Sequence, residues 1–119
     1  MICETLPLID LHRHLDGNIR PDTIWELAQQ NGIDLPVEHF KNFLPHVRIE
    51  DKASDLMEFL VKLDWGVNVL ASLDDCKRVA FENVEDLSLA GIDYFLLYLD
   101  KSLISEGFDP VLYWMVFIP

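Results

Sequence analysis

Two short apolar segments with the character of β-strands limit the folds open to this 119-residue chain. The first runs from Leu8 to His12 or His14, and the second is the compact apolar and aromatic run IDYFLLYLD at residues 92–100. The second pattern is typical of a buried parallel strand. Parallel strands need a long connection that is usually helical, so strand, helical region and strand in this order predict the start of an α/β fold.

Turn and helix signals follow the first strand at once. Asp16-Gly17-Asn18 is typical of a turn, and Pro21 suits the first turn of a helix, where its missing N–H costs nothing. That helix is predicted to run to about Asn31 and to stop at Gly32. The next segment contains two prolines, at positions 36 and 45, and is predicted to be irregular.

Two further helices are predicted before the second strand. Ser54 is the expected N-cap of the first, which carries a one-sided apolar stripe at i, i+3, i+4 and i+7. The stripe consists of Leu56, Phe59, Leu60 and Leu63. The second helix is the best specified in the chain, because Ser72 and Asp75 are spaced as a capping box and Gly91 supplies a stop.

Composition narrows the class of protein. Half of the residues are hydrophobic, which is enough for one small globular domain, and nine basic against twenty-one acidic residues give a net charge of −12. Such a charge repels phosphate backbones and anionic lipid, so neither a nucleic acid nor a membrane is an expected partner. Cys3 and Cys76 form no CxxC pair, and no secretory leader is evident, so we expect a cytoplasmic protein with reduced thiols.

The first strand carries the candidate chemistry. Strand alternation puts Leu8, Asp10, His12 and His14 on one face and Ile9, Leu11, Arg13 and Leu15 on the other. Imidazoles at i and i+2 project in the same direction, so both can reach one divalent ion, with zinc the natural guest. The spacing alone is weak evidence for a metal site, because a surface pair or a hydrogen-bonded pair of histidines is commoner.

Longer motifs resemble a known family. LIDLHRHLDGNIRPDTI at residues 8–24 closely resembles the signature of the adenosine deaminase family. FLVKLDWGVNVLASLDDCKRVAFENVEDLSLAGIDY at residues 59–94 is similar to the bacterial members of that family. The resemblance covers residues 5 to about 95 and implies the N-terminal fragment of a (β/α)8 TIM barrel, with its first strand, helical segment and second strand.

The resemblance also implies roles for individual residues. His12 and His14 match two histidine ligands of the family's catalytic zinc, and the His14 position also lies against the substrate. Asp16 matches an aspartate that helps to bind the nucleoside at its ribose end. The stripe from Leu56 to Leu63 matches a helix that roofs the substrate pocket, although core packing explains such a stripe equally well. The implied reaction is zinc-dependent hydrolytic deamination of adenosine to inosine, with adenine or another purine as the near alternative substrate.

The sequence also departs from the family. A third histidine ligand, an aspartate ligand and the His-Ala-Gly-Glu segment that carries the catalytic glutamate have no counterpart here, so no catalytic residue is assigned. His39 and His46 are the other histidines, and nothing in the sequence around them suggests ligands. Residues 96–119 diverge, with Leu96 and Tyr98 where a glutamate and an arginine are expected.

These departures predict a partial deaminase domain over residues 1–119 that holds an incomplete zinc site and is inactive alone. The alternative is a non-catalytic remnant of a broken deaminase gene that binds a metal weakly or binds a partner. The sequence does not predict an oligomeric state.

Overall fold

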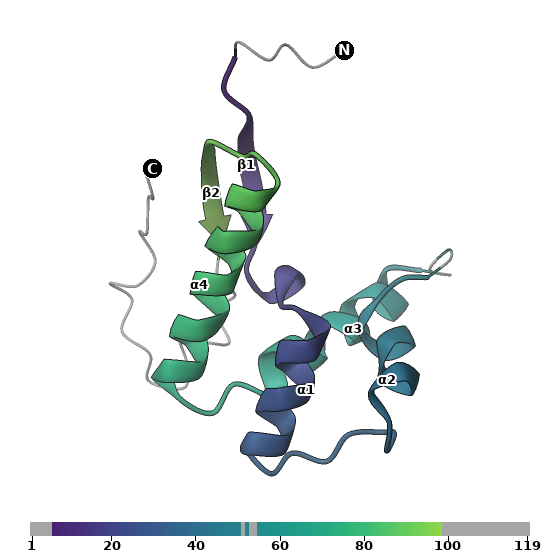
Figure 1. Cartoon of the computed structure of the whole chain (residues 1–119). Helices are drawn as coiled ribbons and strands as arrows, with labels where there is room; N and C mark the ends of the chain where they lie inside the picture. Colours follow the sequence, from purple (N-terminus) through teal and green to yellow (C-terminus); the bar gives the residue numbers. More distant parts are fainter. Residues whose placement is uncertain (1–5, 51, 53–54, 99–119) are drawn as a thin grey trace.

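The computed structural model describes residues 6–50, 52 and 55–98 (Figure 1). Within them, a strand, a 3-10 turn, a run of helices and a second strand follow one another along the chain. In order they are β1 (Ile9–His14), η1 (Asp16–Asn18), α1 (Pro21–Gln30), α2 (Phe40–Val47), α3 (Leu56–Asn68), α4 (Leu73–Leu89) and β2 (Tyr94–Tyr98). None of these described helices is long and apolar enough to cross a membrane.

The two strands pair in parallel, as the sequence predicts. Ile9 lies opposite Tyr94 and His14 lies opposite Tyr98, and the ladder is irregular between Asp10 and Arg13. Helix α4 returns the chain to the start of β2 and lies along one face of this small sheet (Figure 1). The predicted α/β order of first strand, helical segment and parallel second strand is therefore confirmed.

The predicted helix ends are largely confirmed. Helix α1 begins at Pro21, and Ser72 and Asp75 form a complete capping box at the start of α4. Gly32 and Gly91 follow α1 and α4 with φ of 66° and 74°, in the left-handed region where glycine is favoured.

The prediction of an irregular segment around Pro36 and Pro45 is wrong for the second half of that segment. Helix α2 forms there and contains Pro45. Phe43 explains why. Its side chain is 0% exposed, and its ring lies 5.5 Å from that of Trp25 and 5.9 Å from that of Trp65. Burial of an aromatic ring offsets the cost of a proline inside a short helix.

The prediction that Ser54 is the N-cap of α3 is also wrong. The N-cap is Asp55, whose carboxylate accepts a hydrogen bond from the backbone N–H of Glu58 at 2.9 Å. Ser54 itself lies outside the described residues. Serine and aspartate cap helices about equally well, and sequence alone does not choose between adjacent ones.

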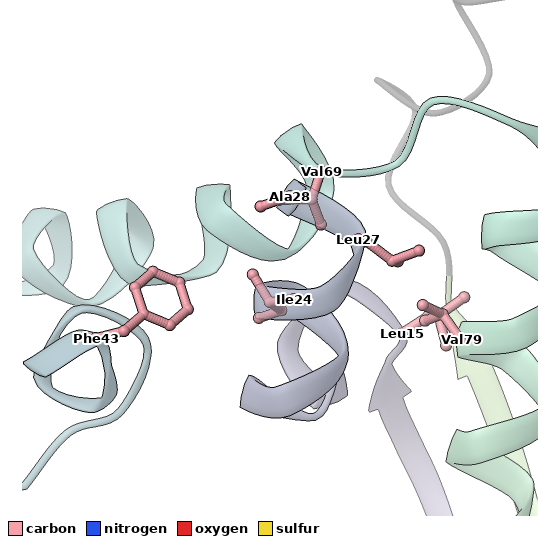
Figure 2. Close-up of a cluster of buried hydrophobic side chains, with 7 residues drawn as sticks. All are labelled: Leu15, Ile24, Leu27, Ala28, Phe43, Val69 and Val79. Carbon is pink, nitrogen blue, oxygen red and sulfur yellow. The ribbon is translucent and has the colours of Figure 1, made fainter. Parts of the chain in front are cut away.

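The hydrophobic core is centred on α1. Ile24, Leu27 and Ala28 of this helix are buried, and Figure 2 shows Val69 beside Ala28 on one side and Leu15 beside Val79 on the other. The core thereby joins the end of β1 to α4. It also holds η1, which follows Leu15 directly, in a defined place.

A buried carboxylate reinforces the junction between α1 and α4. Asp75 is 3% exposed, and its Oδ2 accepts hydrogen bonds from the side chain of Asn31 (3.0 Å) and from the backbone N–H groups of Ala71 (2.9 Å) and Ser72 (3.0 Å). Burial opposes ionisation of this group, but the hydrogen bonds outweigh it and hold the pKa of Asp75 below its usual value. The charged form therefore stabilises the fold.

Ion pairs add a second contact between the same helices. Arg20, just before α1, contacts Asp86 at 2.6 Å and Glu85 at 2.7 Å, and its hydrogen bonds lower the pKa of Asp86. Arg78 of α4 contacts Glu26 of α1 at 2.6 Å. These pairs are partly exposed, so each adds modestly to stability.

We expect Asp75→Ala to lower the free energy of unfolding by about 1–3 kcal/mol, because it leaves several buried donors without an acceptor. Urea unfolding followed by circular dichroism measures this. A group whose folded pKa is lowered stabilises the fold above its unfolded pKa, and this contribution is lost as the pH falls through the folded pKa. The difference between wild type and variant should therefore shrink below about pH 4.

Asp74→Ala is the matched control, because Asp74 is the adjacent residue and its side chain is 88% exposed. It should change stability by less than about 0.5 kcal/mol. Equal effects of the two substitutions would contradict the role given to Asp75.

Candidate metal centre

Strand β1 brings the two predicted histidines together. Nε2 of His12 lies 3.0 Å from Nε2 of His14, and both side chains are exposed. Arg13, between them, points the other way, because its Nε donates to the Oδ1 of Asn83 on α4 at 3.0 Å. The histidines therefore share the face of the sheet that α4 does not cover, which confirms the prediction that they project together.

The separation of the two nitrogens suits a shared ion. Two imidazole nitrogens that each bind a tetrahedral zinc at about 2.0–2.1 Å lie roughly 3.3 Å apart. The observed 3.0 Å is a few tenths of an ångström shorter, because here one ring donates a hydrogen bond to the other. Exchange of that shared proton for a divalent ion needs only a small outward movement of the rings, so the pair fits as two of an ion's ligands.

Asp10 does not share the histidine face as strict alternation predicts. Its Oδ2 lies 3.5 Å from Nη1 of Arg13, and its Oδ1 accepts a hydrogen bond from the backbone N–H of His12. The irregular register between Asp10 and Arg13 is the cause, since it breaks the period of two within the strand. The same irregularity accounts for the exposure of Ile9 and Leu11, which were predicted on the face with buried Leu15.

Asp16 lies in η1, directly beyond the histidines. Its Oδ1 is buried and has no hydrogen-bond partner, and it lies 3.8 Å from Nδ1 of His14. Buried carboxylate oxygens are rarely left without a donor. The arrangement thus leaves one buried acceptor without a partner beside the histidine pair.

Two residues that were not predicted as site residues hold this turn in place. Buried Asn83 bonds Arg13 and also donates to the backbone carbonyl of Asn18 at 3.5 Å. Gly66 allows α3 to approach closely, since a Cβ there would lie 3.2 Å from the carbonyl oxygen of Asp16. Signals existed for both, because Asn83 lies midway between buried Val79 and Leu87 at helical spacing, and a glycine interrupts α3.

The apolar stripe on α3 is mainly exposed. Leu56 is 68% exposed, and Phe59 and Leu60 are also exposed. Leu63, at the end nearer η1, is partly buried and lies 3.7 Å from the point where a Gly17 side chain would begin. Core packing among the described residues does not account for the first three, and their role as a pocket roof stays a prediction.

The remaining histidines lie elsewhere. His39 is the N-cap of α2, and His46 stacks on Phe43 with ring centroids 6.3 Å apart. His46 also lines a cavity of about 480 Å³ between α2 and α3 that includes neither His12 nor His14. Across the described ranges, no group of three or more His, Cys, Asp or Glu side chains is placed to hold a metal ion.

A parallel strand pair with a helical crossover, and with paired histidines at the end of the first strand, defines part of a (β/α)8-barrel protein with a candidate metal site. A model of the family "Adenosine deaminase" matches residues 7–111, which is most of the chain. The chain therefore belongs to the adenosine deaminase family.

Individual relatives agree with this assignment. The adenosine deaminase of Edwardsiella ictaluri is 64% identical over 94 residues, and that of Escherichia coli O157:H7 is 58% identical over 94 residues. Each match covers 79% of this chain and 28% of the relative. The crystal structure of adenine deaminase from Arthrobacter aurescens superimposes with a TM-score of 0.74 at 26% identity, covering 87% of this chain and 31% of that protein. The chain thus spans little more than a quarter of the curated relatives' length.

We expect the 119-residue chain to bind zinc weakly through His12 and His14, and replacement of both by alanine to abolish binding above background. Their converging Nε2 atoms are the reason. Isothermal titration with zinc chloride at neutral pH measures the affinity.

The double variant His39→Ala, His46→Ala is the matched control, since it removes the same number of imidazoles away from the site. It should retain the wild-type affinity. Equal losses in the two double variants would mean that the histidines bind zinc without a defined site.

Proposed function

We propose that this chain contributes the first metal-binding and nucleoside-binding segment of a zinc-dependent adenosine deaminase, which converts adenosine to inosine by hydrolysis. The 3.0 Å convergence of the His12 and His14 Nε2 atoms beside the unpartnered Oδ1 of Asp16 is the observation that carries the proposal. Two imidazole nitrogens and one hydrogen-bond acceptor thus lie at the same strand end, which supports a role for them in binding. Family membership supplies the reaction class.

His12 and His14 would hold the ion, and further ligands would come from protein beyond this segment. A zinc ion bound there would supply water activated for attack near neutral pH. Asp16 would accept a hydrogen bond from a ribose hydroxyl and so orient the nucleoside over the histidine pair. Asn83 and Gly66 would keep the Asp16 turn and β1 in register, and a misplacement of about 1 Å can cost roughly 10²-fold in rate.

Adenosine is the proposed substrate in preference to adenine. Curated relatives at 58–64% identity are named adenosine deaminases, whereas the protein named adenine deaminase is 26% identical. The position of Asp16 also favours a nucleoside, because adenine has no ribose for it to bind.

The 119-residue chain by itself is proposed to be inactive. Catalytic zinc sites use three protein ligands, and within the part of the chain that the structure describes only two histidine nitrogens converge. The chain also lacks a His-Ala-Gly-Glu segment. General acid–base catalysis contributes about 10²–10⁴-fold, so absence of the proton-transferring glutamate alone would abolish most activity.

A non-catalytic role is the second candidate, as a remnant that binds a metal weakly or binds a partner. Two observations favour it: the described residues offer no three-ligand group, and apolar side chains such as Leu11 and Leu56 are exposed. A chimeric enzyme separates the two candidates.

In that chimera, the 94 matched residues of this chain replace their counterpart in the Edwardsiella ictaluri adenosine deaminase. We expect the chimera to deaminate adenosine in an ultraviolet assay, to lose that activity with His12→Ala, and to retain it with His39→Ala. The isolated 119-residue chain should show no turnover above free zinc.

A folded, zinc-loaded chimera without activity would favour the non-catalytic candidate. Turnover by the isolated chain that depends on His12 would contradict its proposed inactivity. A preference of the chimera for adenine would contradict the proposed substrate.

A further inference from the structure

Tyr98 is fixed beside the histidine pair by the backbone. It is the last residue of β2 and lies opposite His14 in the parallel ladder, and its carbonyl accepts a hydrogen bond from the backbone N–H of Leu15 at 2.9 Å. Neighbouring side chains on one face of a sheet lie close enough to interact. The register therefore brings the Tyr98 ring to the face that carries His12 and His14.

The Tyr98 ring stacks on both imidazoles, which themselves meet through their Nε2 atoms. The ring centroid of Tyr98 lies 4.7 Å from that of His12 and 5.8 Å from that of His14, with interplanar angles of 29° and 26°. The two imidazoles are themselves 5.1 Å apart at 28°. All three separations lie in the range in which aromatic rings attract one another. Tyr98 thus contacts both imidazoles across their faces.

This stacking is compatible with metal binding. An imidazole binds an ion through the nitrogen lone pair in the plane of its ring, whereas Tyr98 covers the faces of the rings. Exposed histidines otherwise change rotamer freely, and ordering flexible side chains weakens binding. A ring that restricts both imidazoles beforehand lowers that cost.

We propose that Tyr98 is a positioning residue for the histidine pair, holding both imidazoles so that their Nε2 atoms converge. Its effect on zinc affinity rests on the proposed function, whereas its effect on ring arrangement does not. The stack uses the aromatic ring, so the hydroxyl group is dispensable. Family resemblance predicts an arginine at this position, so the stacking of an aromatic ring on the two histidines is a property of this chain.

The experiment compares Tyr98→Phe, Tyr98→Leu and Tyr94→Leu in the 119-residue chain. Tyr94 is the matched control, because it lies at the opposite end of the same strand, faces Ile9 and is 38% exposed against 41% for Tyr98. Titration with zinc chloride should give an affinity at least about tenfold weaker for Tyr98→Leu, the usual size of a second-sphere effect. Tyr98→Phe and Tyr94→Leu should match wild type.

Nuclear magnetic resonance of the metal-free chain gives a readout that needs no zinc. Ring protons of His12 and His14 should show Overhauser contacts with the Tyr98 ring and upfield ring-current shifts. Both should persist in Tyr98→Phe and Tyr94→Leu, and the Overhauser contact between the His12 and His14 rings should be lost in Tyr98→Leu alone. If circular dichroism shows that Tyr98→Leu is unfolded, Tyr98→Met, which keeps an apolar side chain without a ring, takes its place.

The outcomes separate the two proposals. Unchanged zinc affinity in Tyr98→Leu, or no contact between the Tyr98 and His12 rings in the wild type, overturns the role of Tyr98. A contact between the His12 and His14 rings that is lost only in Tyr98→Leu, in a chain that does not bind zinc, supports the positioning role and overturns the metal site instead. Weaker zinc affinity in Tyr98→Phe would also overturn the proposed role of the Tyr98 ring, since the effect would then belong to the hydroxyl group.

Discussion

Parallel pairing of β1 with β2 is the contact on which the rest of the structure depends. The ladder brings residues 85 positions apart side by side, as in the hydrogen bond from the backbone N–H of Leu8 to the side chain of Asp93. Two parallel strands cannot be joined by a tight turn, so the intervening helices carry the chain from the end of β1 back to the start of β2. The core around α1, the Asp75 junction and the ion pairs of Arg20 therefore all serve to bring β2 to β1. The candidate site follows from that pairing, because its histidines project from one strand and its tyrosine from the other.

The site combines groups whose own bonding is incomplete. Two imidazoles share a single hydrogen bond on an exposed face, and one carboxylate oxygen beside them is buried without a donor. A protein that needed this region for stability alone would gain from satisfying that oxygen. On the opposite face of β1 the polar side chains have hydrogen-bond partners. Arg13 donates to Asn83, and Asn83 donates to the backbone of the turn. Supporting contacts are thus satisfied where α4 covers the sheet, and a buried acceptor without a partner, Oδ1 of Asp16, lies beside the histidines.

Several features were predictable because their causes are local. Pro21 and the Ser72–Asp75 capping box mark helix starts through bonds between residues a few positions apart, and Gly32 and Gly91 mark ends through their own backbone freedom. The formation of α2 was not predictable in this way, because it depends on the packing of Phe43 between Trp25 and Trp65. The prediction that Asp10 shares the histidine face was also wrong, since strict alternation holds only for a regular ladder and this one is irregular.

The sequence by itself determined the α/β order, the pairing of His12 with His14 and the resemblance of residues 8–24 and 59–94 to the adenosine deaminase family. Each of these depends on the spacing or identity of residues close together in the chain. Only the tertiary structure decided that Tyr98 stacks on both histidines, that Asn83 joins β1 to the Asp16 turn and that the stripe from Leu56 to Leu60 is exposed. These are contacts, or the lack of them, between elements far apart in sequence. They depend on the register of the sheet and on the packing of helices against it, and no local pattern encodes either.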